Sequence, residues 1–189
     1  MRNGNPMTTS EDGTAAILAF WMREVGPDRW WVRSDETDAV CAERFAALWE
    51  EWRGRLPESF LKSPDEALAG VILFDQFPRN MFRGHADAFS TDSLALAIAR
   101  GAVDRGLDAR MSDDARSMLY MPFQHSERLA DQERSIALFT ALGNAQSLDF
   151  AHKHRDMIFR YGRFPARNAA LGRSNRPGEE AGIEASRAW

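Results

Sequence analysis

The stretch SDETDAVCAERFAALWEEWRG, residues 34–54, shows most clearly the pattern that sets the fold of this chain. Its large apolar residues fall on one face of an α-helix, spaced by one, four, three and four positions; they are Val40, Cys41, Phe45, Leu48 and Trp52. Ser34 stands where an N-cap residue is expected, and Gly54 is a common residue after a helix end. We therefore predict an amphipathic helix between these two residues.

The same helical period recurs along the chain, and no alternating strand pattern competes with it. Further helices are predicted at about 14–25, 63–77, 91–105, 112–121, 126–142 and 147–161, with a short last helix after Pro177. Pro78 and Pro122 are expected to end two of them, because proline disfavours continuation of a helix. Seven or eight helices joined by short loops predict an all-α domain of stacked antiparallel hairpins.

Length and composition bound the class of protein. A chain of 189 residues with 44% hydrophobic content fits one domain with a substantial core. We expect a disordered lead-in at 1–13, the helical domain at 14–176 and a loosely packed helix or tail at 177–189. The single cysteine, Cys41, allows no internal disulfide, and no apolar run is long enough to cross a membrane. Both observations favour the cytoplasm.

The net charge of −4 is unevenly distributed. Residues 152–176 contain seven Lys or Arg and one acid, a local charge of +6, which leaves −10 for the rest of the chain. A compact basic segment on an acidic chain favours a small anionic ligand or an internal charge interaction. Nucleic-acid binding is not predicted, because it needs a broader basic surface. The sequence predicts no cofactor and does not indicate the oligomeric state.

Polar residues interrupt the apolar face of the helix predicted at 63–77. Leu68, Val71 and Ile72 form that face, and Asp75 continues it. Asp75 should therefore be buried, and a buried carboxylate needs a charged or hydrogen-bonding partner. Arg79 is a candidate partner; the pair would be either a structural ion pair or part of a ligand site.

Two later helices show the same interruption. His154 lies on the apolar face of the helix at 147–161, flanked by Arg155, and Gln132 lies on that of the helix at 126–142. His125 and Glu127 stand just before the latter helix. One shared pocket explains these inward polar groups more simply than three separate accidents.

The chemistry of such a pocket is only weakly specified. His125 could act as a general base oriented by Glu127, with His154 nearby. No spacing typical of a metal site, a phosphate-binding glycine loop or a serine nucleophile occurs. We assign no metal and no catalytic residue, and His125, Glu127 and His154 are the candidates.

Three motifs carry a resemblance to a known family: FDQFPRNMFRG at 74–84, PFQHSERLADQERS at 122–135 and HKHRDMIFRYGRFPARNAALGR at 152–173. They strongly resemble the uncharacterised, largely bacterial family called domain of unknown function 924. The resemblance implies a helical fold like that of tetratricopeptide repeats, and no known activity. It places the family's motif residues at Asp75, Gln76, Arg79, Asn80, Arg83, His125, Glu127, Gln132, His154, Arg155, Arg163, Arg167, Asn168 and Arg173. This chain departs from the pattern at Ala19, Ala166 and 174–176.

Three functions remain open. The leading hypothesis is a pocket for a small carboxylate or phosphate, since arginine meets an oxyanion with two parallel hydrogen bonds. Its expected ligand-binding residues are Asp75, Gln76, Arg79, Asn80, Arg83, Gln132, Arg155, Arg163, Arg167 and Asn168. The alternatives are a helical-repeat scaffold for a protein or peptide, and a hydrolase-like enzyme using His125 and Glu127.

The two segments FDQFPRN and GRFPARN are expected to meet in space. Each turns at a proline after a phenylalanine and presents Arg and Asn beyond it. We predict that Arg79, Asn80, Arg163, Arg167 and Asn168 surround Asp75 and His154. If acids balance these arginines, the cluster is a structural clasp; if they do not, it is a binding site.

Overall fold

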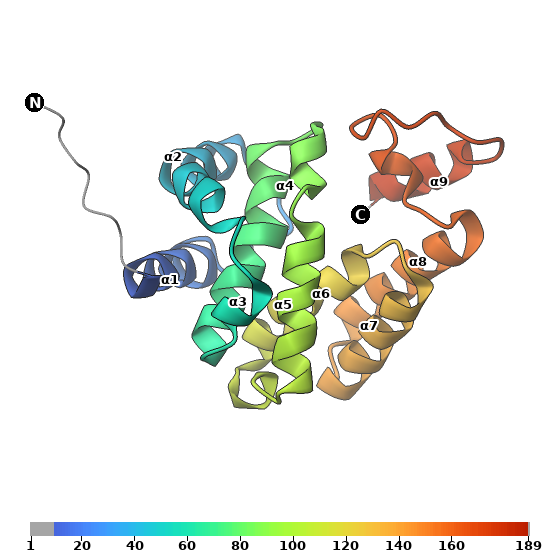
Figure 1. Ribbon diagram of the computed structural model, residues 1–189. Helices are drawn as coiled ribbons and strands as arrows, with labels where there is room; N and C mark the ends of the chain where they lie inside the picture. The colour runs from blue at the N-terminus through green and yellow to red at the C-terminus, as the bar shows by residue number, and fades with distance from the viewer. Residues whose placement is uncertain (1–9, 189) are drawn as a thin grey trace, which may run out of the picture.

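The structure is a computed structural model, and it describes residues 10–188 (Figure 1). The α-helices are α1 Ser10–Leu18, α2 Asp35–Trp52, α3 Pro64–Val71, α4 Phe77–Met81, α5 Asp92–Asp104, α6 Asp113–His125, α7 Leu129–Leu142, α8 Ala145–Tyr161 and α9 Glu180–Ala185. Two π-helical segments, η1 Ala19–Val25 and η3 Ile72–Gln76, extend α1 and join α3 to α4. Short 3-10 turns are η2 Pro57–Phe60, η4 Ala86–Phe89, η5 Asp108–Arg110, η6 Pro165–Arg167 and η7 Ser186–Ala188. Residues 10–188 contain no strand, so the all-α prediction is confirmed.

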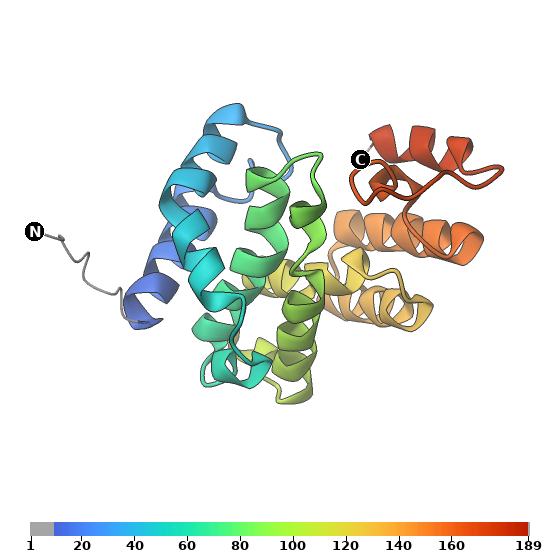
Figure 2. The ribbon, with the colours of Figure 1, turned by 45° about the horizontal axis from the view of Figure 1, so that its top comes forward.

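Helices of the N-terminal half pack on the next helix but one, and those from α5 to α8 pack on the next helix in sequence. α1 and α2 lie against α3 and α4, and α5 packs on α3 (Figures 1 and 2). α6 contacts α3 and α5 on one side and the α7–α8 hairpin on the other. α9 lies beyond α8 at the opposite end of the molecule from α1 (Figure 2). α6 thus joins the N-terminal helices to the C-terminal ones.

Aromatic side chains fill the main core. The rings of Phe45 and Phe77 lie 4.6 Å apart, and Phe20 and Trp21 contact the same Phe77 ring at 5.9 and 5.6 Å. All four side chains are buried. A separate small apolar cluster lies between α8 and the segment around Phe164. This segment belongs to the residues that follow α8, 162–188, which we call the C-terminal arm.

Local capping residues set several helix starts as predicted. The side chains of Ser34, Ser63 and Ser112 accept hydrogen bonds from backbone N–H groups three residues on. These bonds satisfy amide donors that have no partner within the helix.

The helix predicted to stop at Phe77 continues through Pro78 to Met81, so this boundary was wrong. The π-helical segment before it bonds the Phe77 N–H to the Ile72 carbonyl, which changes the hydrogen-bond register ahead of the proline. Pro78 has no N–H to donate to the Phe74 carbonyl. That carbonyl instead accepts a hydrogen bond from the Thr91 hydroxyl at 2.7 Å. A partner from α5's N-terminus thus replaces the missing amide.

The prediction that Pro122 ends a helix was also wrong, because α6 continues to His125. Side chains from elsewhere stabilise its last turn. Gln132 Nε2 donates to the Gln124 carbonyl at 2.7 Å, and Arg167 donates to the His125 carbonyl at 2.9 Å. These bonds satisfy carbonyls at the helix end that lack an intrahelical partner.

Three helix starts differ from the prediction. α1 begins at Ser10, within the expected lead-in, and packs Gly13 so close to Trp52 that a Cβ there would lie 2.7 Å from the indole. α7 begins three residues late, because Ser126 bonds the Arg128 N–H and the Asp131 carboxylate in a turn. α8 begins early because Asn144 is its cap. Residues 1–9 of the lead-in lie outside the described part.

Candidate functional site

Asp75 lies in the π-helical segment and is fully buried, as predicted. Its carboxylate accepts a hydrogen bond from Gln76 Nε2 at 2.6 Å and lies 2.8 and 2.9 Å from His125 Nδ1. Arg79 is 3.5 Å away. Burial alone would raise the pKa of Asp75, but the Arg79 charge and the bonds from His125 and Gln76 lower that pKa to about 2. Asp75 is therefore an ionised carboxylate in the core.

This geometry fixes the protonation state of His125. A carboxylate only accepts hydrogen bonds, so His125 Nδ1 carries the proton and donates it toward Asp75. Burial, with the charge of Arg79, lowers the pKa of His125 despite the opposing effect of Asp75. The ring is thus neutral near pH 7, with an unprotonated Nε2.

The expected pairing of His125 with Glu127 was wrong. Glu127 accepts two bonds from Arg173, at 2.8 and 3.0 Å, and one from the Phe164 N–H at 2.8 Å. Burial alone would raise the pKa of Glu127, but these bonds outweigh burial, and the pKa lies below its ordinary value. Glu127 follows the end of α6, so its side chain reaches the C-terminal arm, while Asp75 takes the place beside the imidazole.

The two proline segments do meet, and Asp92 joins them. Arg79 makes two bonds to the Asp92 carboxylate, at 2.8 and 3.0 Å, and Arg167 contacts the same group at 3.3 Å. Both guanidinium groups lie over the Phe89 ring, at 5.6 and 4.8 Å. Burial and the nearby Arg79 charge lower the pKa of Arg167 to about 10.

Arg163 and Asn168 were expected beside Asp75 and His154, and this part of the prediction was wrong. Arg163 makes two bonds to Glu179, at 2.8 and 2.9 Å, and Asn168 donates to the same carboxylate at 2.9 Å. Arg163 stands before η6 and Arg167 is its last residue, so this short turn sends the two arginines to different acids.

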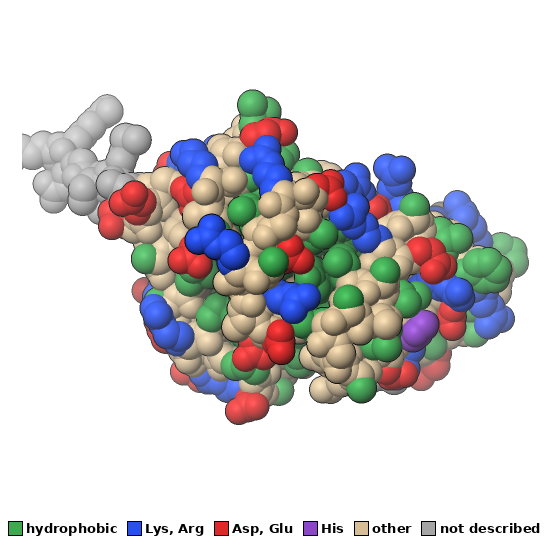
Figure 3. Space-filling model, turned by 90° about the horizontal axis from the view of Figure 1, so that it is seen from below, with side chains coloured by type: hydrophobic (Ala, Val, Ile, Leu, Met, Phe, Trp, Pro, Cys, Tyr) green, Lys and Arg blue, Asp and Glu red, His purple; other side chains and the backbone are tan. Residues whose placement is uncertain are grey.

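The remaining predicted residues act elsewhere. Asn80 Nδ2 donates to the Gln76 carbonyl at 2.9 Å, and Arg83 pairs with Asp38 at the surface. Arg155 pairs with Glu133 and is half-exposed. Basic and acidic side chains are interspersed over the face seen in Figure 3, without a patch of one sign.

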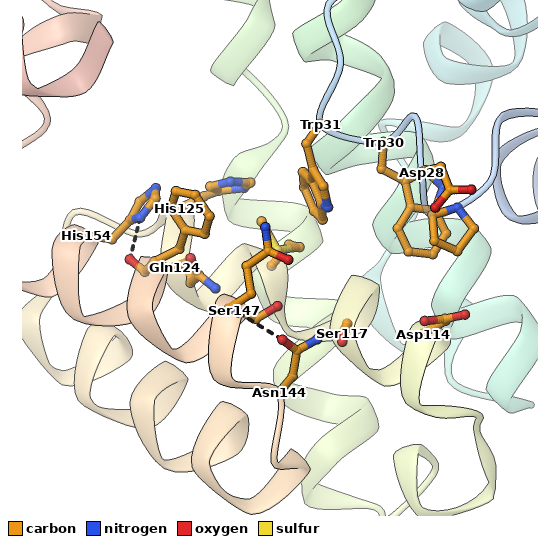
Figure 4. Close-up of a pocket in the computed structure, with 14 residues that line it drawn as sticks. Asp28, Trp30, Trp31, Asp114, Ser117, Gln124, His125, Asn144, Ser147 and His154 are labelled. Atoms are coloured by element: carbon orange, nitrogen blue, oxygen red, sulfur yellow. Dashed lines mark hydrogen bonds between the residues drawn. The ribbon is translucent and has the colours of Figure 1, made fainter. Parts of the chain in front are cut away.

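A pocket of about 660 Å³ lies beside the buried pair, between one face of α6 and one face of α8. The loop after η1 also lines it. Its lining residues are Pro27, Asp28, Trp30, Trp31, Asp114, Ser117, Met121, Gln124, His125, Asn144, Gln146, Ser147, Phe150 and His154. Figure 4 shows His125, His154 and Gln124 at one end, Asp28 and Asp114 at the other, and the Trp31 ring between them.

His154 is the second histidine at the inner end. Its Nδ1 donates to the Phe150 carbonyl at 2.8 Å, and its ring centre lies 6.3 Å from that of His125 (Figure 4). Burial, with the neighbouring His125, lowers the pKa of His154 to about 3. Both histidines therefore enter the pocket as neutral rings at pH 7.

Sequence reasoning missed several members of the site. Asp114, Ser117, Met121 and Gln124 recur at three- or four-residue spacing, a signal that α6 has a second inward face once its continuation past Pro122 is known. The loop residues Trp30 and Trp31 carry no such local signal. Asp92 and Glu179, the acids that pair with the arginines, were also missed.

Metal and membrane features are absent from the part of the chain that the structure describes. Within 10–188, no three His, Cys, Asp or Glu side chains are placed to hold a metal ion. None of the helices in that range has the length and apolar content needed to cross a bilayer.

Comparison with known proteins places the chain in a family. The profile described as "Bacterial protein of unknown function (DUF924)" matches residues 17–186. The chain belongs to this family. A solved structure, the protein of unknown function ATU0120 from Agrobacterium tumefaciens, is 38% identical, with a TM-score of 0.84 over 91% of this chain and 97% of that one. No curated protein matches this chain.

Proposed function

We propose that the protein binds a small molecule in the pocket between α6 and α8, and that His125 accepts a proton from it. The observation that carries the proposal is the Asp75–His125 pair: a fully buried, ionised carboxylate 2.8 Å from Nδ1 of a ring that lines the pocket. Volumes of a few hundred Å³ are typical of small-molecule sites.

The pair has the form needed for general base catalysis. Asp75 holds the proton on Nδ1, so the lone pair of Nε2 is left to accept a proton from a ligand O–H or N–H group. The resulting imidazolium is stabilised by the carboxylate behind it. Asp75 is thus a positioning residue. No described Ser, Thr or Cys is hydrogen-bonded to His125, which favours a bound water or the ligand itself as proton donor over a nucleophilic side chain.

The same pocket gives little support to an anionic ligand. None of the described residues that line it is Lys or Arg. The arginines expected to hold an anion bind carboxylates instead, as in the Arg79–Asp92 and Arg163–Glu179 pairs. The proposal therefore keeps the small-molecule pocket and assigns the arginines to the protein's own acids.

A peptide or protein is the second candidate occupant. Trp31 lines the pocket and is 56% exposed, and the next residue, Val32, is 59% exposed. Exposed apolar side chains at a pocket rim favour a binding surface. A cytoplasmic location remains part of the proposal.

The protonation state is tested directly by nitrogen NMR. In histidine labelled with ¹⁵N, two-bond ¹H–¹⁵N spectra at pH 7 should show His125 as the Nδ1–H tautomer. Asp75→Asn, whose amide can donate to Nδ1, should shift His125 toward the Nε2–H tautomer. An Nε2–H tautomer in the wild type would overturn the proposal.

Ligand binding is tested by a ligand-observed NMR screen of small fragments. Wild type should bind a subset of fragments that His125→Gln binds at least several-fold more weakly. His152→Gln is the matched control, because His152 is exposed on α8 and does not line the pocket. Equal binding by wild type and His125→Gln would show that the fragments do not use His125.

A further inference from the structure

The charges that line the pocket are of one sign. Asp28 and Asp114 come from different elements, the loop after η1 and the first turn of α6, and both lie at the outer end (Figure 4). The two histidines at the inner end have lowered pKa values and are neutral near pH 7. No described lining residue is a cation, so the pocket itself leaves these carboxylates unbalanced.

Gln124 supplies an independent sign of a ligand at the inner end. Its side chain is only 1% exposed and lines the pocket, yet Oε1 has no hydrogen-bond partner among the described residues. Buried amide groups are nearly always satisfied, so one left open at a pocket wall indicates a group that is satisfied on binding. The unprotonated Nε2 of His125 is a second acceptor at this end.

Trp31 lies between the two ends (Figure 4). Its ring meets that of Trp30 edge-on at 6.3 Å, and Trp30 is fixed by a bond from Nε1 to the Trp21 carbonyl at 2.8 Å. The face of an indole attracts cations and stacks on flat apolar groups. The middle of the pocket therefore suits an apolar ring or a positive charge.

We infer that the ligand of this pocket is a small organic amine, protonated at pH 7 and carrying a flat apolar part. Its ammonium group lies by Asp28 and Asp114 next to Trp31, and its far end donates a hydrogen bond to Gln124 or His125. The inference rests on the proposed pocket and adds the chemical class of its occupant. Acceptors at both ends, with an aromatic ring between them, match a molecule that donates at both ends.

Three probes with one skeleton test this inference: tryptamine, its alcohol analogue tryptophol, and indole-3-propionate. They share the indole ring and differ in the charge of the side chain. By calorimetry at low salt, tryptamine should bind about tenfold more tightly than either of the others. Added salt should weaken the binding of tryptamine and leave that of tryptophol unchanged.

Two variants test whether Asp28 and Asp114 are the carboxylates that bind the ammonium group. Asp28→Asn and Asp114→Asn should each weaken tryptamine binding several-fold without changing tryptophol binding, which also shows that the variants are folded. Asp113→Asn is the matched control, because Asp113 is the exposed neighbour on α6 and does not line the pocket. Tryptophol or indole-3-propionate binding as tightly as tryptamine would overturn the amine and leave the pocket standing. Binding of none of the three would overturn both.

Discussion

Asp75 shows how a single buried charge is tolerated in this core. Three side chains supply what water would otherwise supply: an amide from Gln76, an imidazole N–H from His125 and the charge of Arg79. Two of these come from the same helix, and the third comes from α6. The carboxylate therefore stabilises the contact between α6 and the π-helical segment, and also sets the tautomer of His125.

Asp75→Ala is expected to lower the free energy of unfolding by about 3–5 kcal/mol, because it leaves the largely buried Arg79 without one of its acids and His125 Nδ1–H without its acceptor. Urea denaturation at pH 7 measures this. Asp87→Ala, at a half-exposed position paired with the exposed His85, should change stability by less than about 0.5 kcal/mol. A melting curve of Asp75→Ala within a degree of wild type would contradict the expected role.

His154 should make the protein less stable in mild acid. Its pKa is about 3 in the folded chain, against 6.5 for an unperturbed histidine. Between these values the unfolded chain binds more protons, so this contribution is complete above pH 6.5 and is lost as pH falls toward 3. From pH 6.5 to about pH 5 the loss from this group is about 2 kcal/mol.

Urea unfolding at the two pH values measures that loss. His154→Phe removes the titrating group and should lose correspondingly less stability on acidification than wild type. His152→Phe, two residues away and exposed, should keep the wild-type dependence. The same dependence in wild type and His154→Phe would show that His154 is not held neutral.

At the scale of elements, the helix from α3 to α4 is continuous because its neighbours complete its hydrogen bonds. The π-helical segment and Pro78 leave carbonyls without the usual amide partner. The hydroxyl of Thr91 donates a hydrogen bond to the Phe74 carbonyl. In the same way the side chain of Arg79 donates to the Asp75 carbonyl, and that of Asn80 donates to the Gln76 carbonyl. The motif FDQFPRN therefore supplies two of the three donors that these carbonyls need, and the N-terminus of α5 supplies the third.

Thr91→Val is expected to destabilise the protein by about 2 kcal/mol or more. It leaves the Phe74 carbonyl unbonded, together with Trp49 Nε1, which donates to the Thr91 hydroxyl at 3.2 Å. Thr91→Ser keeps the hydroxyl and should recover most of the loss. Urea unfolding of the two variants compares them; equal stability would show that the hydroxyl does not matter.

Local signals predicted the elements well where the determinants are local. Caps act within one turn: the cap predicted at Ser34 was confirmed, and Ser63 and Ser112 cap the helices that were predicted to start there. The stops expected at Pro78 and Pro122 were wrong because partners distant in sequence complete those helices. A pattern within a dozen residues carries no information about such partners.

For the candidate site, the sequence predicted which residues face inward but not which residues they contact. An apolar period shows that Asp75 faces inward, but not which imidazole it meets fifty residues later. Arg167 and Asp92 are 75 residues apart in sequence, and no spacing rule connects them. The pocket also depends on the loop that carries Trp31, which is tied to η1 by the bond from Trp30 Nε1 to the Trp21 carbonyl.

At the scale of the whole molecule, acidic side chains hold the C-terminal arm in place through ion pairs and hydrogen bonds. The tail forms the short helix α9, as expected, and the buried Glu179 stands immediately before it. Glu179 is 1% exposed and binds Arg163, Asn168 and the Arg176 N–H. The bonds from Arg163 lower the pKa of Glu179 to about 2. Together with the Arg167–Asp92 and Arg173–Glu127 pairs, this pairs three arginines of the basic segment with acids from outside it.

This pairing separates a structural clasp from an anion site. In a clasp, Glu179 already occupies the position that an external carboxylate would take. Phosphate, sulfate and acetate should therefore leave the thermal stability of wild type unchanged at constant ionic strength. Selective stabilisation of wild type by one of them, abolished in Arg163→Ala, would instead identify an anion site.

Glu179→Ala converts the clasp into a vacancy with the same donors. Arg163, Asn168 and the Arg176 N–H would then face a space that a small carboxylate fits, so the variant should be destabilised and acetate should restore part of the lost melting temperature. Glu180→Ala, at the exposed neighbouring position, should be as stable as wild type with or without acetate. Differential scanning fluorimetry with acetate, and with chloride at equal ionic strength, measures the effect. Rescue of Glu179→Ala by acetate alone would show that the arginine is a carboxylate receptor whose ligand is the protein's own tail; no rescue would mean that the site collapses when Glu179 is lost.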